Sequence, residues 1–362
     1  MQVGSEFLED RHGSLSCISC HGGQSGIQTK EAAHVGMIAD PSAGDAPACR
    51  ECHAGIVERH AKSVHATQSG YFTMFEKRTG QTQVSEELRS MFDTHCAGCH
   101  TSCGQCHISR PTSVRGGLVQ QHVVRRTPSQ VSNCIACHGS RVGDEYRGRN
   151  SGIPPDVHYL PGNKDCFFCH TGMELHGDGT TPETRYEVDA LPQCVDCHPE
   201  VLTDTENLQH SLHAGGDSGP PKLSCQVCHS VGYKNCYNCH VDVEERGLEH
   251  PSQIDFRIGR NPIPDDERRP WDYVVLRHVP IAPNSFEPWG VDLPQYAAEP
   301  TWKYATPHNI RRETPQNASC DACHEDENLF LTGDYIEALI GEGVMFPEER
   351  DANQDVIVEE LP

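Results

Sequence analysis

The stretch from Cys96 to His107, CAGCHTSCGQCH, contains the pattern C-x-x-C-H twice within twelve residues. The same pattern recurs along the chain and uses all 20 cysteines, so it occurs ten times. In chain order, sites one to ten consist of Cys17, Cys20 and His21; Cys49, Cys52 and His53; Cys96, Cys99 and His100; Cys103, Cys106 and His107; Cys134, Cys137 and His138; Cys166, Cys169 and His170; Cys194, Cys197 and His198; Cys225, Cys228 and His229; Cys236, Cys239 and His240; and Cys320, Cys323 and His324.

This pattern is the attachment signature of a c-type haem. Two thiols three positions apart can form thioethers on one edge of a porphyrin, and the next residue supplies an imidazole to the iron. Disulfides, zinc ribbons and redox dithiols are alternative uses of paired cysteines, but none explains a histidine after every pair. The sequence therefore predicts ten haem c groups (iron) and leaves no cysteine for a disulfide or a lipid anchor.

Thirteen histidines remain after the ten proximal ones are assigned, because the chain has 23. We expect both axial positions of each iron to carry histidine, which leaves no room for a substrate. The expected distal ligands are His12, His34, His65, His95, His122, His158, His176, His213, His278 and His308, with His60, His210 and His250 in reserve. Methionine is the competing axial ligand, but no methionine recurs in a similar context, and gap-filling is the better interpretation.

Composition limits both the fold and the partners. Only 36% of the residues are hydrophobic, and the chain contains 32 Gly and 25 Pro. We expect a multihaem cytochrome c fold, a mostly irregular chain with short α-helices and few strands whose core is formed by stacked haems. A formal charge of −23 argues against nucleic acid as a partner. No stretch is long and apolar enough to predict a membrane span.

The order of the sites indicates a duplicated five-haem module, because each half reads single, single, close pair, single. We place the first module at 1–150 and the second at 151–324. The segment Ser63–Ala66 follows site two, and the similar segment Ser211–Ala214 follows site seven, although coincidence in a histidine-rich chain is the alternative.

Two segments lack attachment sites. Residues 241–319 hold all three tryptophans and eleven prolines, which predicts an extended wrap without central strands; a disordered linker is the alternative. Residues 325–362 form an acidic C-terminal tail with a short helix expected near Asp334–Leu339. That tail is interpreted either as solvated or as a strap that docks on a neighbouring subunit or a basic partner.

With these motifs, the chain resembles the multihaem c-type cytochromes of anaerobic respiration, among them decahaem and pentahaem-repeat cytochromes of metal-reducing bacteria. The resemblance covers Cys17 to His324, and it extends to the Ser-x-His-Ala wording around His65 and His213. It implies an extracytoplasmic electron-transfer protein, periplasmic or extracellular, that conducts electrons along bis-histidine haems as a respiratory conduit or as a subunit of a polymeric cytochrome filament. Export requires a signal peptide, and the first ten residues do not resemble one.

The implied partners are other redox proteins or copies of the same chain, and metal ions or mineral surfaces. In the filament variant, His12 could bind the iron of a neighbouring subunit. An enzyme remains the alternative function: a multihaem oxidoreductase that keeps one iron five-coordinate and acts on a small nitrogen or sulfur compound. The excess of histidines argues against such an open iron site, but a count does not show where each ring points.

Overall fold

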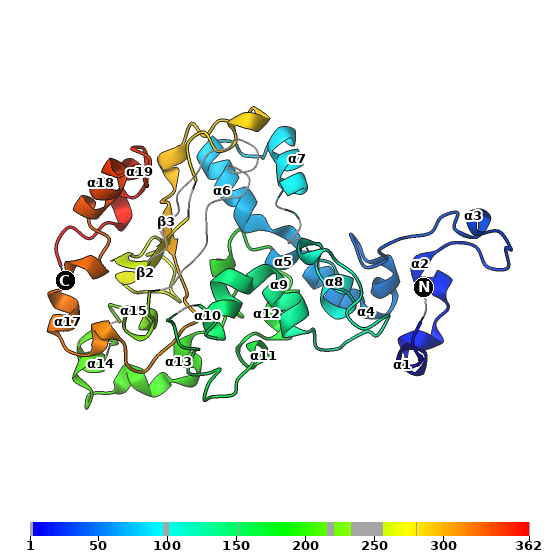
Figure 1. Ribbon diagram of the computed structural model, residues 1–362, viewed down its shortest axis with the longest axis horizontal. Coiled ribbons are helices and arrows are strands. Elements are labelled where there is room, and N and C mark those ends of the chain that lie inside the picture. Colours follow the sequence, from blue (N-terminus) through cyan, green and yellow to red (C-terminus); the bar gives the residue numbers. More distant parts are fainter. Residues whose placement is uncertain are drawn as a thin grey trace. The chain divides into compact units, whose positions relative to one another are not determined.

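The computed structural model describes residues 3–95, 97, 101–150, 152–215, 221–232, 256–279 and 281–361 (Figure 1). Some predicted ligands lie outside the described residues: Cys96, Cys99 and His100 of site three, Cys236, Cys239 and His240 of site nine, and His250.

Short helices separated by irregular chain make up most of the described structure. The α-helices are α1 (Ser5–Glu9), α2 (Cys17–His21), α3 (Lys30–Ala33), α4 (Pro47–His60), α5 (Val64–Thr67), α6 (Ser69–Thr79), α7 (Glu86–His95), α8 (Cys103–His107), α9 (Ile135–His138), α10 (Asp144–Tyr146), α11 (Cys166–Cys169), α12 (Gly172–His176), α13 (Cys194–Cys197), α14 (Leu208–His213), α15 (Cys225–His229), α17 (Asp321–His324), α18 (Gly333–Gly341) and α19 (Glu349–Ala352). The strands are β1 (Phe256–Arg260), β2 (Tyr273–His278) and β3 (Trp302–Tyr304).

Each described C-x-x-C-H motif is helical over most of its length. A helix places residues three apart on the same face, so both cysteines of a motif point to one side. The residue before the first cysteine often caps this turn: the Ser16 and Ser102 side chains accept backbone N–H groups of Ser19 and Gln105. These caps matter because a single turn is not stable without tertiary support.

The chain divides into two compact units, and their boundaries differ from those of the expected modules. Unit 1 comprises Met1–Tyr71, Phe92–Gly139 and His170–Leu191, so it includes a segment of the second repeat. Its helices α2 and α12 both pack against α4. Of the 27 buried hydrophobic residues among those described, unit 1 contributes only three, Ala46, Val57 and Phe92. Unit 1 therefore lacks an ordinary hydrophobic core.

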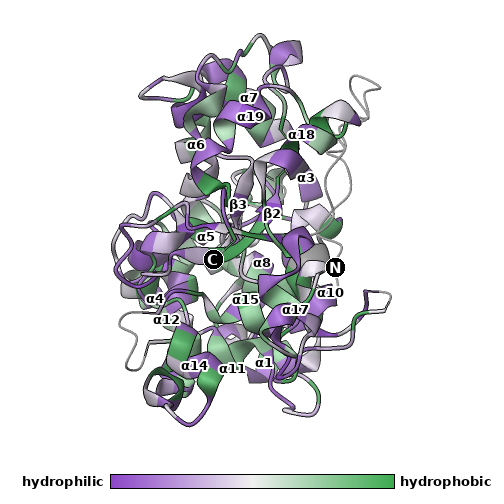
Figure 2. Cartoon of the chain, turned by 90° about the vertical axis from the view of Figure 1, so that its left-hand side faces the viewer, coloured by the Kyte–Doolittle hydropathy of each residue, from purple (hydrophilic) through white to green (hydrophobic). Residues whose placement is uncertain are grey.

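Unit 2 comprises Phe72–Met91, Ser140–Cys169 and Pro192–Pro362, and it has such a core. Its sheet is antiparallel in the order β1-β2-β3, with Ile258 opposite Val275 and His278 opposite Trp302. Strand β2 carries the hydrophobic colour in Figure 2, and Val274, Val275 and Leu276 are fully buried. The expectation that this part of the chain has no central strand was wrong, because its prolines lie between the strands and not within them.

The acidic C-terminal segment folds onto this sheet. The Leu331 backbone N–H donates to the Ile258 carbonyl at 2.8 Å, and Val358 N–H donates to the Leu331 carbonyl at 2.9 Å. Helix α18 forms where a short helix was expected and buries Ile336 and Leu339. Within the described residues, the segment is therefore neither a solvated tail nor a free strap, because its apolar side chains complete the core of its own unit.

No helix in the described part of the chain combines the length and the apolar composition needed to cross a bilayer.

Candidate functional site

Histidine rings meet in pairs, and seven of these pairs join a proximal histidine of a C-x-x-C-H motif to a histidine from another part of the chain. Seven proximal histidines have such a partner at ring-centre distances of 6.0–6.4 Å. The pairs are His12–His53 at 6.4 Å, His21–His122 at 6.3 Å, His65–His138 at 6.4 Å, His107–His176 at 6.1 Å, His158–His198 at 6.2 Å, His210–His229 at 6.2 Å and His213–His324 at 6.0 Å.

This spacing fits one metal ion between two imidazoles. A metal–imidazole bond is about 2 Å long and the ring centre lies about 1 Å behind the nitrogen, so two rings on opposite sides of one metal are centred about 6 Å apart. Imidazoles in direct contact would not need this gap. No group of three or more His, Cys, Asp or Glu side chains suited to a bare ion occurs within the described ranges. The spacing of the pairs also fits a haem iron, for which a porphyrin would supply the other four ligands.

In many of these rings, Nδ1 is the nitrogen that takes part in a hydrogen bond. Among the proximal residues, Nδ1 of His21, His107 and His229 lies 3.0, 2.6 and 2.9 Å from the carbonyl oxygens of Ile38, Arg125 and Arg311. In site six, Nδ1 of His170 lies 2.9 Å from both carboxylate oxygens of Glu174. An acceptor at Nδ1 fixes the tautomer that presents Nε2 to a metal.

For some of the distal residues, carboxylates take this role. Asp10 Oδ1 lies 2.6 Å from Nδ1 of His12, and Asp156 Oδ1 lies 2.8 Å from Nδ1 of His158. In both cases the same oxygen also accepts the backbone N–H of the histidine. A carboxylate at Nδ1 makes the imidazole a stronger electron donor to a metal.

Burial keeps several paired imidazoles neutral, as metal binding requires. Burial, together with the nearby His138, lowers the pKa of His65 to about 4. Burial is also the first cause of the lowered pKa of His138 and of His176, followed by the neighbouring rings of His170 and His107 respectively. Protonation would place two cations about 6 Å apart in a poorly solvated site, which the fold disfavours.

The cysteine thiols are all free among the described residues, and some from different sites come together. The Cys49 and Cys103 side chains are within hydrogen-bonding reach, which lowers the pKa of Cys103 to about 7 and raises that of Cys49. The same arrangement recurs between Cys194 and Cys225. Sites two and four are therefore neighbours in unit 1, and sites seven and eight are neighbours in unit 2.

Several of the histidine pairs repeat between the two halves of the chain, and the Asp–His hydrogen bond at His12 repeats at His158. The Asp-x-His segments at His12 and His158 serve sites two and seven, and the Ser-x-His-Ala segments at His65 and His213 serve sites five and ten. These repeated contacts argue against coincidence in the sequence pattern.

The contacts also change how the close pairs of sites are matched. The order of sites aligns site three with site eight, but the hydrogen bonds align site four with site eight. His107 and His229 bond to the carbonyls of Arg125 and Arg311, and both arginines lie nine residues before the next described site (134 − 125 = 9; 320 − 311 = 9). If sites four and eight are equivalent, the other member of each close pair lies on a different side in the sequence: site three precedes site four, and site nine follows site eight.

The expected distal ligands do not all occupy equivalent positions. Six of them, and His210 from the reserve group, lie beside a proximal ring. His278 instead has its Nε2 at 2.7 Å from Glu349 Oε2, with both side chains fully buried and its ring 5.6 Å from that of Trp302. Because Nε2 is engaged with a carboxylate, His278 has the environment of a structural histidine rather than of a ligand.

The other expected ligands have varied surroundings. His34 caps α3 and is exposed, and His95 ends α7. His308 has Nδ1 at 2.9 Å from the Thr306 carbonyl, in the same manner as the paired histidines. The ring of His60, a reserve residue, lies 6.5 Å from that of His176.

Sequence reasoning did not identify the supporting carboxylates Asp10, Asp156 and Glu174. The repeated Asp-x-His wording was a usable signal for the first two, because both precede a site by a few residues.

Comparisons with known proteins identify no relative: no family model matches the chain, and searches of curated proteins and of solved structures found no match.

Proposed function

We propose that the chain is an extracytoplasmic electron-transfer protein that carries ten haem c groups, each bound through the two cysteines of a C-x-x-C-H motif. The observation that carries this proposal is the set of seven His–His pairs. Each contains one motif histidine, and each is spaced for a metal between the rings. When bound, haem iron supplies one-electron redox chemistry.

The residues of the chain would restrict that chemistry to electron transfer. The seven histidine pairs would each supply two imidazoles to one iron, which would leave no free coordination site there for a small molecule. The Nδ1 hydrogen bonds hold the rings in place, and the carboxylates of Asp10 and Asp156 would stabilise the oxidised form of a bound metal. Neighbouring thiols, such as those of Cys49 and Cys103, would bring adjacent haem edges close enough for electron hopping.

The proposal is tested by mass spectrometry and electron paramagnetic resonance of the purified, exported protein. We expect ten haem masses on one chain and a low-spin ferric spectrum. Fewer haems would contradict the attachment assignment. A high-spin signal of one iron per chain would instead favour the alternative function, an oxidoreductase with one five-coordinate haem.

A further inference from the structure

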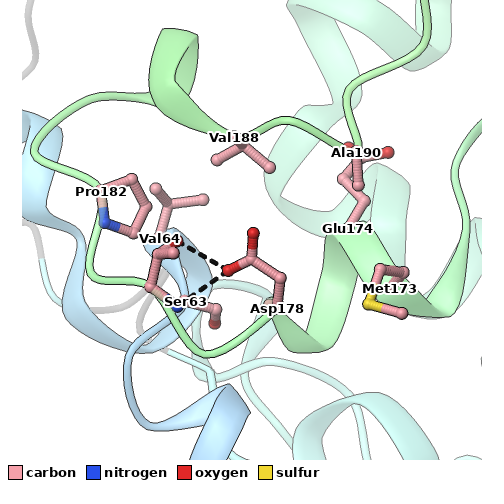
Figure 3. A pocket seen from close by; sticks show the side chains of 10 residues that line it. Ser63, Val64, Met173, Glu174, Asp178, Pro182, Val188 and Ala190 are labelled. Carbon is pink, nitrogen blue, oxygen red and sulfur yellow. Dashed lines mark hydrogen bonds between the residues drawn. The ribbon is translucent and has the colours of Figure 1, made fainter.

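The small cavity in Figure 3 is lined by a carboxylate that already has hydrogen-bond partners within the chain. Asp178 Oδ1 accepts the backbone N–H and the hydroxyl of Thr180 at 2.8 and 2.6 Å. Buried polar atoms usually have such partners, because an unpaired one costs free energy. Arg311 of unit 2 is different: its Nε and Nη2 atoms are buried and make no hydrogen bond with any residue that the structure describes.

These two nitrogens of Arg311 are the pair that recognises an oxyanion. The N–H bonds of Nε and Nη2 point in the same direction, so a single carboxylate or phosphate can accept both. We call this pair of nitrogens the fork of Arg311. Because a buried cation is costly unless an anion pairs with it, the fork indicates a binding site for such a group.

The backbone of Arg311 is bound to the proximal histidine of site eight. Arg311 N–H donates to the His229 carbonyl at 2.7 Å, and His229 Nδ1 lies 2.9 Å from the Arg311 carbonyl oxygen. Two residues earlier, the side chain of the fully buried Asn309 makes hydrogen bonds of 3.2 and 2.9 Å with the backbone N–H and carbonyl of Val231. The segment that carries the fork is therefore fixed to site eight.

The corresponding arginine at site four has a partner of its own. His107 Nδ1 lies 2.6 Å from the Arg125 carbonyl oxygen, in the same manner as His229 and Arg311. Arg125 Nη2, however, donates to Gln120 Oε1 at 3.0 Å. The two sites thus share the backbone contact, whereas the fork of Arg311 is left for a ligand.

We propose that the fork of Arg311 binds a carboxylate of the haem at site eight and raises the reduction potential of that haem. The cation offsets the negative charge of the carboxylate, so an added electron at the iron is stabilised. At the neighbouring site seven, Asp156 would stabilise the oxidised form through His158. An electron shared by these two sites therefore favours site eight. The inference rests on the proposed function and adds a direction to it.

The test requires the signal of one haem among ten. His210→Ala supplies it, because loss of the ring opposite His229 should make site eight a high-spin haem in an otherwise low-spin protein. The high-spin absorption of the full-length, haem-loaded protein is followed in a redox titration, with His210→Ala alone and combined with Arg311→Gln or Arg311→Lys.

We expect Arg311→Gln to change the ratio of oxidised to reduced haem at site eight about tenfold, which lowers its potential by about 59 mV. Arg311→Lys keeps the charge but loses the fork, so it should recover part of this shift. An altered potential separates this role from a purely structural one. An unchanged potential in Arg311→Gln, with the high-spin haem present, would overturn the inference and leave the proposed function intact.

Arg125→Gln in His176→Ala protein is the matched control, because His176 faces His107 at site four. We expect less than a twofold change in the redox equilibrium of the high-spin haem there. A shift as large as that of Arg311→Gln would overturn the proposal, since the fork would then have no special role.

Two further outcomes are distinguishable. Fewer than ten haems in the wild-type protein would contradict the proposed function itself, whereas a His210→Ala protein with ten haems and no high-spin signal would overturn only the assignment of site eight. Replacing chloride by phosphate at constant ionic strength tests a solution anion as the ligand. We expect no change; a phosphate-dependent shift that Arg311→Gln abolishes would overturn the haem carboxylate as the ligand.

Discussion

At the scale of single residues, the nitrogen that accepts or donates a hydrogen bond distinguishes the histidines. His12, His158 and His210 direct Nδ1 to a carboxylate, which leaves Nε2 for the opposite ring. His278 directs Nε2 to Glu349. In the sequence, all four are histidines outside the C-x-x-C-H motifs, and nothing local distinguishes them. The choice of His278 as an expected ligand and of His210 as a reserve residue therefore had no physical basis in the sequence.

Replacing these two histidines should give opposite results. His210→Ala should remove one axial ligand at site eight and convert one iron in ten to the high-spin form, because alanine has no donor atom. His278→Gln should leave all irons low-spin, since the amide can still pair with Glu349. Electron paramagnetic resonance measures both. A high-spin signal from His278→Gln would show that this residue is a ligand after all.

Removing the carboxylates at Nδ1 should raise haem reduction potentials. In Asp156→Asn, the imidazole of His158 loses its negatively charged partner and donates less electron density to the iron of site seven. We expect a rise on the order of 60 mV, which is a tenfold change in a one-electron equilibrium. A spectroscopic redox titration measures it.

Asp10→Asn is the matched comparison at site two. The Asp156 side chain is 2% exposed and that of Asp10 is 38% exposed, so solvent should make the second shift smaller. Equal potentials in wild type and Asp156→Asn would contradict the role of this carboxylate.

At the scale of elements, the chain combines short helices at the C-x-x-C-H motifs with a sheet that has a hydrophobic core. Apart from α4, the motif helices that the structure describes are about one turn long and need an added group or a neighbour to persist. The sheet and the C-terminal segment form an ordinary core, in which Glu349 joins Thr301 Oγ1 at 2.5 Å, His278 Nε2 at 2.7 Å and the Phe346 backbone N–H at 3.0 Å.

Glu349→Ala should destabilise unit 2 by about 3 kcal/mol, because it leaves buried polar groups without their acceptor. Urea unfolding followed by circular dichroism measures the loss, and proteolysis should cut within residues 325–361 sooner. Glu337→Ala is the control, since Glu337 pairs with Arg350 at the surface. A similar unfolding midpoint for both variants would show that the buried network contributes little.

The short helices were predictable because each motif must place two cysteines on one side. The recurrence of Asp-x-His and Ser-x-His-Ala at matching places can also be read from the sequence, and a duplicated module remains a prediction from it. The sheet was not, because proline content over a long window conceals strands of three to six residues that contain none. Which rings pair also depends on contacts across 19 to 111 residues, for example between His213 and His324 (324 − 213 = 111), and no local pattern specifies these.

At the scale of the whole molecule, the formal charge of −23 should affect the reduction potential of every proposed haem iron. Each reduction adds an electron to an already negative molecule, so the charge lowers the reduction potentials. Salt screens this repulsion over about 10 Å at 0.1 M. The midpoint potentials should therefore rise from low to high ionic strength, as measured by redox titration in sodium chloride. A fall in potential with added salt would contradict this electrostatic account.

The pairing of His107 with His176 has a consequence for the first half of the chain. A gene fragment that ended at residue 150 would encode every cysteine of the first five sites, and yet site four would lack the ring that faces its proximal histidine. The first half therefore depends on the second for the ring that faces His107, and residues 1–150 by themselves do not supply every histidine pair of their own sites.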